Sequence, residues 1–239
     1  MRSSFWANCK MRSIISCSVR MISFNHYCIS LAIIHFTIEA VNQLFGDEKM
    51  ATGTIPTALY RWMKEGHIYQ LKRGTYMTHR FYELHRADAD FAPSVSAILI
   101  PQSYVSLEYI LQRYGILSEI TYPVTAITLK HTRVIENKIG TFTYRNIKQA
   151  LYNEFTILKY MGIPFSQATV AKALFDYLYL HPFEMESRSP SYDLAEDLCL
   201  NLDDRSQDEQ DEFAEIVAAS KSRKMDQVLN HLRKTVWRH

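Results

Sequence analysis

The segment from residue 54 to 77 constrains the fold most, because a helix signal passes directly into a hairpin signal. Thr54 can cap the helix, Pro56 fits its first turn, and Gly66 can end it. Two short extended runs then flank the sequence Lys72-Arg73-Gly74, which predicts a hairpin with a basic tip. Apolar side chains recur before it at helical spacing, at Ile55, Leu59, Trp62 and Met63.

The opposite face of this helix and the hairpin tip carry groups that bind phosphates and base edges. We therefore expect a winged helix-turn-helix domain over residues 23–80, with helices at 23–35 and 38–45 before the recognition helix. Arg61 suits a bidentate guanine contact, and the tip cations suit phosphates or a minor groove. The other interpretation is a small helical subdomain with a solvated hairpin. The candidate DNA-binding residues are Thr54, Thr57, Tyr60, Arg61, Lys64, Gln70, Lys72, Arg73 and Thr75.

The charge of the chain is unevenly distributed along its 239 residues. Residues 1–80 hold ten Lys and Arg against four acids, and residues 81–180 hold nine against eight. Residues 181–239 hold eight against thirteen, so the net charge of +2 conceals a basic beginning and an acidic end. A basic module on a near-neutral body attracts a polyanion locally. We interpret the acidic end as a solvated helical face rather than a DNA mimic.

The rest of the sequence predicts a second domain over residues 93–239. Because helices and strands are both expected, the predicted fold class is α+β. This domain is expected to hold a small sheet and to end in helices after residue 193, where apolar residues recur at helical spacing. Ser106 can cap one of its earlier helices. Helices are expected at 93–100, 103–114 and 167–180, and strands at 122–130, 133–136 and 140–147.

The beginning of the chain differs from the rest in its hydropathy. Residues 14–36 are moderately apolar but are interrupted by polar and charged side chains, so they do not predict a spanning helix. We expect residues 1–22 to form a poorly ordered extension. Hydrophobic content of 47% and charged content of 22% are typical of a folded soluble protein. We therefore expect a cytoplasmic protein with no membrane partner.

Motifs for catalysis, metals or cofactors are weak. The Glu136-Asn137-Lys138 spacing is that of metal-dependent nucleases, but the strand at 122–130 lacks the upstream acid, and turn chemistry explains the triplet more simply. No histidine pair has metal-ligand spacing on a helix. We expect no enzyme activity, no catalytic residue, no metal site and no cofactor. Because they lack C-x-x-C spacing, four residues are expected to be reduced thiols: Cys9, Cys17, Cys28 and Cys199.

Four segments in order carry a resemblance to a known family. A helix ending in glycine leads to an Arg-Gly-Thr-Tyr wing, followed by a Tyr-x-Ser-Leu-Glu segment, a Gly-x-Phe-x-Tyr strand and an Ala-rich helix containing Lys172 and Asp176. Over residues 36–180 the chain resembles the AbiEi family, the antitoxin and autorepressor half of type IV toxin–antitoxin systems. The resemblance implies a repressor that binds double-stranded operator DNA with inverted repeats. It also implies a second domain that neutralises a cognate nucleotidyltransferase toxin.

The chain departs from the family pattern at Val170 and Ala171, where the family usually has proline and glutamate. Lys172 and Asp176 remain, and their i, i+4 spacing predicts a local ion pair worth a few tenths of a kcal/mol. We favour this structural role over a binding role. The alternative function is a stand-alone winged-helix regulator whose second domain senses a ligand or an unrelated protein, with no toxin partner.

Overall fold

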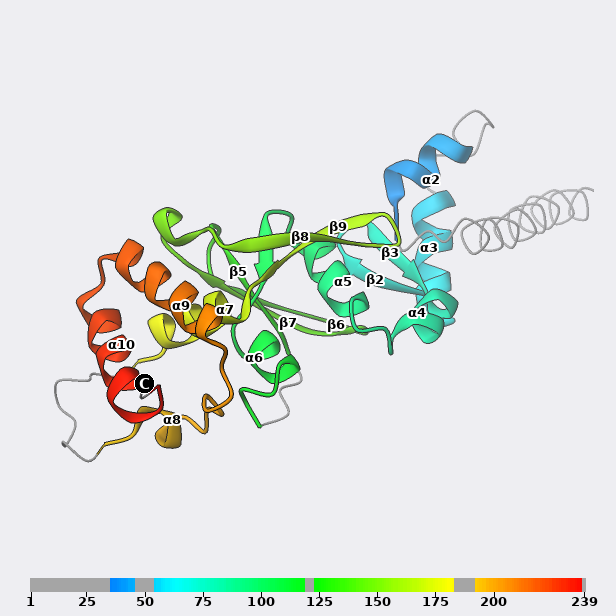
Figure 1. The fold of residues 1–239 in the computed structure, drawn as a ribbon. Helices are drawn as coiled ribbons and strands as arrows, with labels where there is room; N and C mark the ends of the chain where they lie inside the picture. Colours follow the sequence, from blue (N-terminus) through cyan, green and yellow to red (C-terminus); the bar gives the residue numbers. More distant parts are fainter. Residues whose placement is uncertain (1–34, 46–53, 119–122, 183–191, 238–239) are drawn as a thin grey trace, which may run out of the picture. The chain divides into compact units, whose positions relative to one another are not determined.

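The computed structural model describes residues 35–45, 54–118, 123–182 and 192–237, which form an α+β protein (Figure 1). This confirms the predicted fold class. The chain divides between Ala87 and Asp88 into two compact units, here called unit 1 and unit 2. In the described residues, unit 1 holds a three-stranded antiparallel sheet and unit 2 a six-stranded mixed sheet. The expected extension over 1–22 and nearly all of the expected helix at 23–35 lie outside the described residues.

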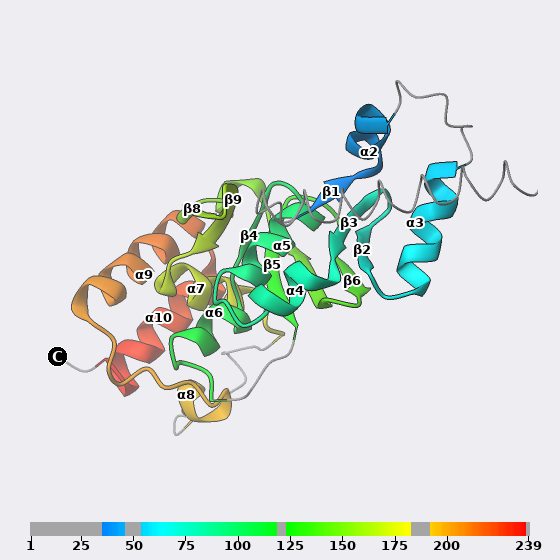
Figure 2. The ribbon, with the colours of Figure 1, turned by 90° about the vertical axis from the view of Figure 1, so that its right-hand side faces the viewer.

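Unit 1 combines two helices, a hairpin and a third, short helix. The sheet order is β1-β3-β2, so the second strand of the hairpin lies in the centre and the first lies at an edge (Figure 2). The described elements are β1 (Phe36–Thr37), α2 (Ile38–Phe45), α3 (Thr54–Lys64), β2 (Ile68–Lys72), β3 (Thr75–Thr78) and α4 (His79–His85).

The apolar stripe predicted on α3 faces the core of unit 1. Leu59 is buried there, and the Phe36 and Tyr76 rings stack with centroids 5.7 Å apart. Thr37 Oγ1 accepts the Ala40 N–H and so caps the first turn of α2. The core consists of Phe36, Val41, Leu59, Ile68 and Tyr76, with Ile38, Ile55, Trp62 and Met63 packed against it.

Unit 2 is built on a sheet with the order β6-β7-β5-β4-β9-β8. The pairs β5/β7 and β4/β9 are parallel, and the other neighbours are antiparallel. This sheet is larger than the small one that the sequence predicted. The strands are β4 (Ser103–Val105), β5 (Val124–Thr128), β6 (Arg133–Asn137), β7 (Gly140–Asn146), β8 (Phe155–Tyr160) and β9 (Ile163–Ala168).

Helices cover both faces of this sheet. Tyr144 on β7 bonds to Ser96 of α5 on one face, whereas Tyr104 on β4 bonds to Asp176 of α7 on the other. Strand β5 is buried along its whole length, as expected for a central strand that helices cover on both faces. The helices are α5 (Phe91–Leu99), α6 (Glu108–Arg113), the 3-10 turn η1 (Gln149–Leu151), α7 (Val170–Leu180), α8 (Leu194–Asp197), α9 (Gln207–Ser220) and α10 (Arg223–Thr235).

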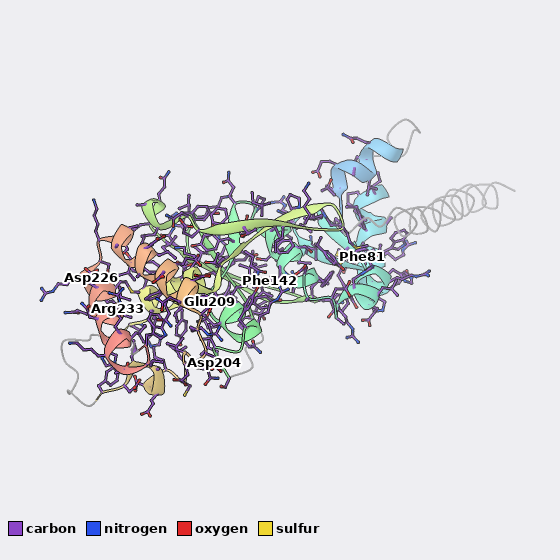
Figure 3. The ribbon with its side chains drawn as sticks, viewed as in Figure 1. Phe81, Phe142, Asp204, Glu209, Asp226 and Arg233 are labelled. Carbon is purple, nitrogen blue, oxygen red and sulfur yellow. The ribbon has the colours of Figure 1, made fainter. Side chains whose placement is uncertain are left out.

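The packing of α7, α9 and α10 encloses a second part of the core of unit 2. Phe213 of α9 and Trp237 after α10 contact edge to face, with ring centroids 5.5 Å apart. Figure 3 shows Phe142 in the interior of the unit, whereas Asp226 and Arg233 lie on the outer side of α10. Among the described helices, none is both long and apolar enough to cross a bilayer.

Two predicted helices of unit 2 begin later than expected, because strand pairing takes their first residues. Residues 103–105 form β4 between β5 and β9, and α6 begins only at Glu108. The side chain of Ser106 does not cap that helix. Residues 167 and 168 pair with β8, so α7 begins at Val170, where Thr169 Oγ1 accepts the Lys172 N–H. The first of the helices expected after residue 193 is short, since α8 has four residues.

A buried polar network joins β4 to α7. Asp176 is fully buried and its Oδ2 accepts hydrogen bonds from Tyr104 Oη at 2.9 Å and Ser106 Oγ at 2.8 Å. Lys172 Nζ lies 2.8 Å from Asp176 Oδ1 and donates to the Leu151 carbonyl at 2.7 Å. Burial and the nearby carboxylate raise the pKa of Tyr104, which keeps its hydroxyl protonated as a donor. The network therefore fastens the strand, the helix and η1 together.

The predicted Lys172–Asp176 ion pair is present, and it is buried. The value of a few tenths of a kcal/mol given from its i, i+4 spacing applies to pairs on the surface of a helix. Both side chains are 0% exposed, so each charge depends on the other for its stability in the core. Removing one partner of a buried pair typically costs about 3–5 kcal/mol, because the remaining charge is left uncompensated.

We expect Asp176→Ala to lower the free energy of unfolding of unit 2 by about 3–5 kcal/mol, as measured by urea denaturation. The exposed Asp211 on α9 provides the control, and Asp211→Ala should change stability by less than about 0.5 kcal/mol. The double replacement Lys172→Met with Asp176→Leu should recover most of the lost stability. A cost below about 1 kcal/mol for Asp176→Ala would contradict the role given to the network.

Candidate nucleic-acid interface

Helix α3 presents one polar face to solvent. Because an α-helix turns by about 100° per residue, burying Leu59 and its apolar neighbours directs the polar positions outward. Lys64 Nζ lies 5.2 Å from the centroid of the Tyr60 ring, so a cation and an aromatic ring share this face. The exposed polar side chains, spaced at i, i+3, i+4 and i+7, are Thr57, Tyr60, Arg61 and Lys64.

The end of α3 is fixed by a glycine in the left-handed region. Gly66 has φ of +77°, donates its N–H to the Met63 carbonyl, and is followed by His67, whose N–H reaches the Trp62 carbonyl at 3.0 Å. These two bonds form the Schellman pattern, which turns the chain sharply out of a helix. The turn leads directly into β2, so the helix and the hairpin are consecutive parts of one rigid unit.

The hairpin ends in a two-residue turn at its tip. Lys72 pairs with Thr75 across Arg73 and Gly74, and Gly74 has φ of +76°. The Gly74 carbonyl also accepts the Ile38 N–H at 2.9 Å, which ties the tip to the start of α2. A register shift between Gln70 and Lys72 marks a bulge, which increases the twist of the strands near the tip.

The candidate DNA-binding residues fall into three groups. Gln70 and Arg73 are exposed, like the four side chains on α3, and Lys72 is half-buried. Thr75 is different: it lies in the central strand between Thr37 and Lys72, is 5% exposed, and cannot reach a ligand. We exclude it from the interface. The side chain of Thr54 lies outside the described set.

The electrostatics of this surface favour an anion. The described residues of unit 1 hold six Lys and Arg against three acids. Glu65, the acid at the end of α3, lies 3.5 Å from His67 and is the only acid on the helix or hairpin in the described part. Burial and the Lys72 cation lower the pKa of His35, so this histidine is neutral at pH 7. The surface thus carries the four cations of Arg61, Lys64, Lys72 and Arg73.

Other expected features lie elsewhere. Glu136 is exposed on the edge strand β6, and Lys138 follows at the turn, where Asn137 Oδ1 accepts two backbone N–H groups. The described residues contain no group of three or more His, Cys, Asp or Glu side chains placed to hold a metal ion. Cys199 is an exposed free thiol, and the other three cysteines lie outside the described residues.

Sequence reasoning missed a second set of exposed cations, in unit 2. They come from the end of β7 and from the connection between β5 and β6. A charge count in a twenty-residue window would have found them, because residues 129–148 hold five Lys and Arg against one Glu. The exposed members without a described salt bridge are Lys130, Arg133, Arg145 and Lys148.

A comparison with models of known protein families finds no match to this chain, and a search of curated protein sequences finds no significant match.

Replacing Gly66 should loosen the connection between α3 and β2. An L side chain in the left-handed region costs about 1–2 kcal/mol, so Gly66→Ala should increase amide exchange in residues 55–72 by about 5–30-fold. Hydrogen exchange read by mass spectrometry measures this effect locally. Gly66→Asn should have a smaller effect because Asn tolerates this region better, and the neighbouring Glu65→Ala serves as the control. Equal effects of all three changes would contradict the assignment.

Proposed function

We propose that this protein is a sequence-specific regulator that binds double-stranded DNA through a winged helix-turn-helix in unit 1. The observation that carries the proposal is that one polar face of α3 and the hairpin tip carry four cations, of which Arg61, Lys64 and Arg73 are exposed and Lys72 is half-buried. The element order of strand, helix, helix and hairpin, with the sheet order β1-β3-β2, agrees with the winged-helix arrangement. Most of the described cations of unit 1 lie on α3 and the hairpin tip. A charge pattern without a function would not need to be concentrated on these two elements.

In this proposal α3 is the recognition helix. A helix with its side chains is about 10–12 Å wide and fits the major groove of B-DNA, which is about 12 Å wide. Arg61 lies in the middle of the exposed face and presents a planar fork suited to guanine O6 and N7. Thr57 lies one turn earlier and Lys64 nearly one turn later, within reach of phosphates along the same groove.

The hairpin acts as the wing. Arg73 is exposed at the turn, and the bulge beside Lys72 shapes the strand that carries it. Phosphate contacts of this kind supply affinity without reading sequence, and each adds about 0.9 to the slope of log K against log salt. Gly74 sets the shape of the tip, since its positive φ closes the two-residue turn.

The resemblance to the AbiEi family extends the proposal to autorepression of an operon with inverted-repeat operator sites, and to neutralisation of a nucleotidyltransferase toxin by unit 2. Two of the resembling segments meet in the buried network, since Tyr104 and Ser106 come from one and Lys172 and Asp176 from the other. Ala171, where the family usually has glutamate, is 2% exposed. These observations support a shared structural role for the segments and leave the toxin as a proposed partner.

The alternative proposal is a stand-alone regulator whose unit 2 senses a ligand or an unrelated protein. Both proposals assign unit 1 to DNA and require no catalytic residue or cofactor. The two proposals make different predictions about the neighbouring gene. An antitoxin requires a nucleotidyltransferase encoded beside it, whereas a stand-alone regulator does not.

Arg61→Ala and Arg73→Ala should have different effects on DNA binding. Loss of a guanine contact should reduce the preference for DNA from upstream of the gene over a scrambled duplex by about 1–3 kcal/mol. Loss of a phosphate contact at Arg73 should weaken both duplexes alike and lower the salt slope by about 0.9. Fluorescence anisotropy over a range of salt concentrations measures both quantities.

The control for this pair is Arg80→Ala, which removes an exposed cation from α4 outside the proposed surface. It should leave the preference between the two duplexes unchanged. The assignment fails if the Arg61 and Arg73 variants bind both duplexes as the unmodified protein does.

The antitoxin role is tested by co-expression with the product of the neighbouring nucleotidyltransferase gene. We expect this protein to relieve the growth arrest that the neighbour causes alone. A variant lacking the cations of α3 and the wing should still relieve it, because that role is assigned to unit 2. Failure of the unmodified protein to restore growth would leave the stand-alone regulator as the better proposal.

A further inference from the structure

The second set of exposed cations lies at one end of the sheet in unit 2. Strands β5 and β7 are parallel and end together, with Thr128 opposite Asn146 in the register. Strand β6 begins at the same end, where Arg133 lies opposite Tyr144 and so next to Arg145. Adjacent strands lie about 4.8 Å apart and successive side chains point to opposite faces. Arg133 shares the face of Tyr144, so Arg133 and Arg145 place their charges on the two faces of this one sheet end.

Hydrogen bonds fix the backbone that carries these cations. The Asn146 side-chain amide donates to the Lys130 carbonyl at 3.0 Å, and the Asn146 N–H donates to Thr132 Oγ1 at 3.1 Å. The Lys130 N–H in turn donates to Thr128 Oγ1 at 3.2 Å. The connection from β5 to β6 is therefore bound to the end of β7 rather than free to separate from it.

In the part of the chain that the structure describes, the exposed cations at this end of the sheet are Lys130, Arg133, Arg145 and Lys148, called here the basic strand end. None of the four side chains forms a salt bridge there, and the one acid of residues 129–148, Glu136, lies three positions along β6 at the level of Thr141. Like charges at one end of a sheet repel one another, and a bound anion offsets this repulsion.

The charge of this segment contrasts with its surroundings. Residues 88–239 hold sixteen Lys and Arg against twenty acids, a net charge of −4, whereas residues 129–148 alone have a net charge of +4. If cations were placed at random along unit 2, a segment with a net charge of +4 would not be expected within a unit of net charge −4. In open α/β sheets the carboxyl ends of parallel strands are also the usual position of ligand-binding groups.

We propose that the basic strand end is a second DNA-binding surface, which contacts the phosphate backbone of a duplex without reading its sequence. The extended arrangement over neighbouring strands suits a linear polyanion, since duplex DNA carries one negative charge per about 1.7 Å of its axis. This inference rests on the proposed function in one respect, since that function identifies DNA as the anion that is bound. The cluster itself belongs to unit 2 and not to the winged helix.

The test compares two double variants of the full chain that remove the same charge. Arg145→Gln with Lys148→Gln changes the basic strand end, whereas Lys159→Gln with Arg233→Gln changes two exposed cations elsewhere in unit 2. On duplex DNA from upstream of the gene, the first variant should lower the salt slope by about 1.8, or 0.9 for each lost phosphate contact. The preference for this duplex over a scrambled one should stay the same. Equal salt slopes for the two double variants would overturn the proposal.

A second background separates this inference from the proposed function. Substituting Gln for Arg61, Lys64, Lys72 and Arg73 removes the cations of α3 and the wing. This protein should keep weak, salt-sensitive binding to any duplex, and adding Arg145→Gln and Lys148→Gln should abolish it. If the unmodified protein shows no preference for upstream DNA but this residual binding is found, only the proposed function of unit 1 fails. If the residual binding is absent, or is found with structured RNA alone, the basic strand end is not a DNA-binding surface.

Discussion

Helix α3 can bury its apolar side chains only by directing its polar side chains into solvent, because both sets repeat with the helical period. The stripe centred on Leu59 packs on Phe36, Ile68 and Tyr76 and so sets the rotation of the helix about its axis. That rotation places Arg61 outward. The Schellman turn at Gly66 then sets the direction in which the chain enters the hairpin. The proposed DNA-binding surface thus depends on the packing of residues that would never touch DNA.

Unit 2 depends in a similar way on one buried carboxylate. Asp176 binds a lysine from its own helix and the hydroxyl groups of Tyr104 on β4 and of Ser106 just after that strand, and the lysine extends the network to η1. Because a buried charge is tolerated only when its partners are correctly placed, the network selects one position of α7 against the sheet. The sheet can then expose other parts of its edge, including the basic strand end, without loss of the central packing.

Sequence reasoning succeeded where a pattern was long and local. It located the apolar stripe of α3, the helix-ending Gly66 and the hairpin tip, and the structure confirms each of them. It failed for residues 103–105, which form a strand because they pair with β5 and β9, far away in the sequence. It also missed β9, whose residues pair with the preceding strand β8 in a hairpin and with β4. Runs of this length fit a helix or a strand equally well until their partners are known. The burial of Thr75 was missed for a related reason, since only the strand order shows that β3 is central.

By itself the sequence determined the α+β class, the concentration of cations near the N-terminal part, and which side of α3 is polar. Composition and the period of a helix are properties of neighbouring residues, so they need no knowledge of the rest of the fold. The tertiary structure alone decided that Lys172 and Asp176 are buried, and that cations separated by up to eighteen positions lie at the same end of the sheet, where β5 and β7 end. Burial and proximity of this kind are set by long-range strand pairing, which no local pattern of residues specifies.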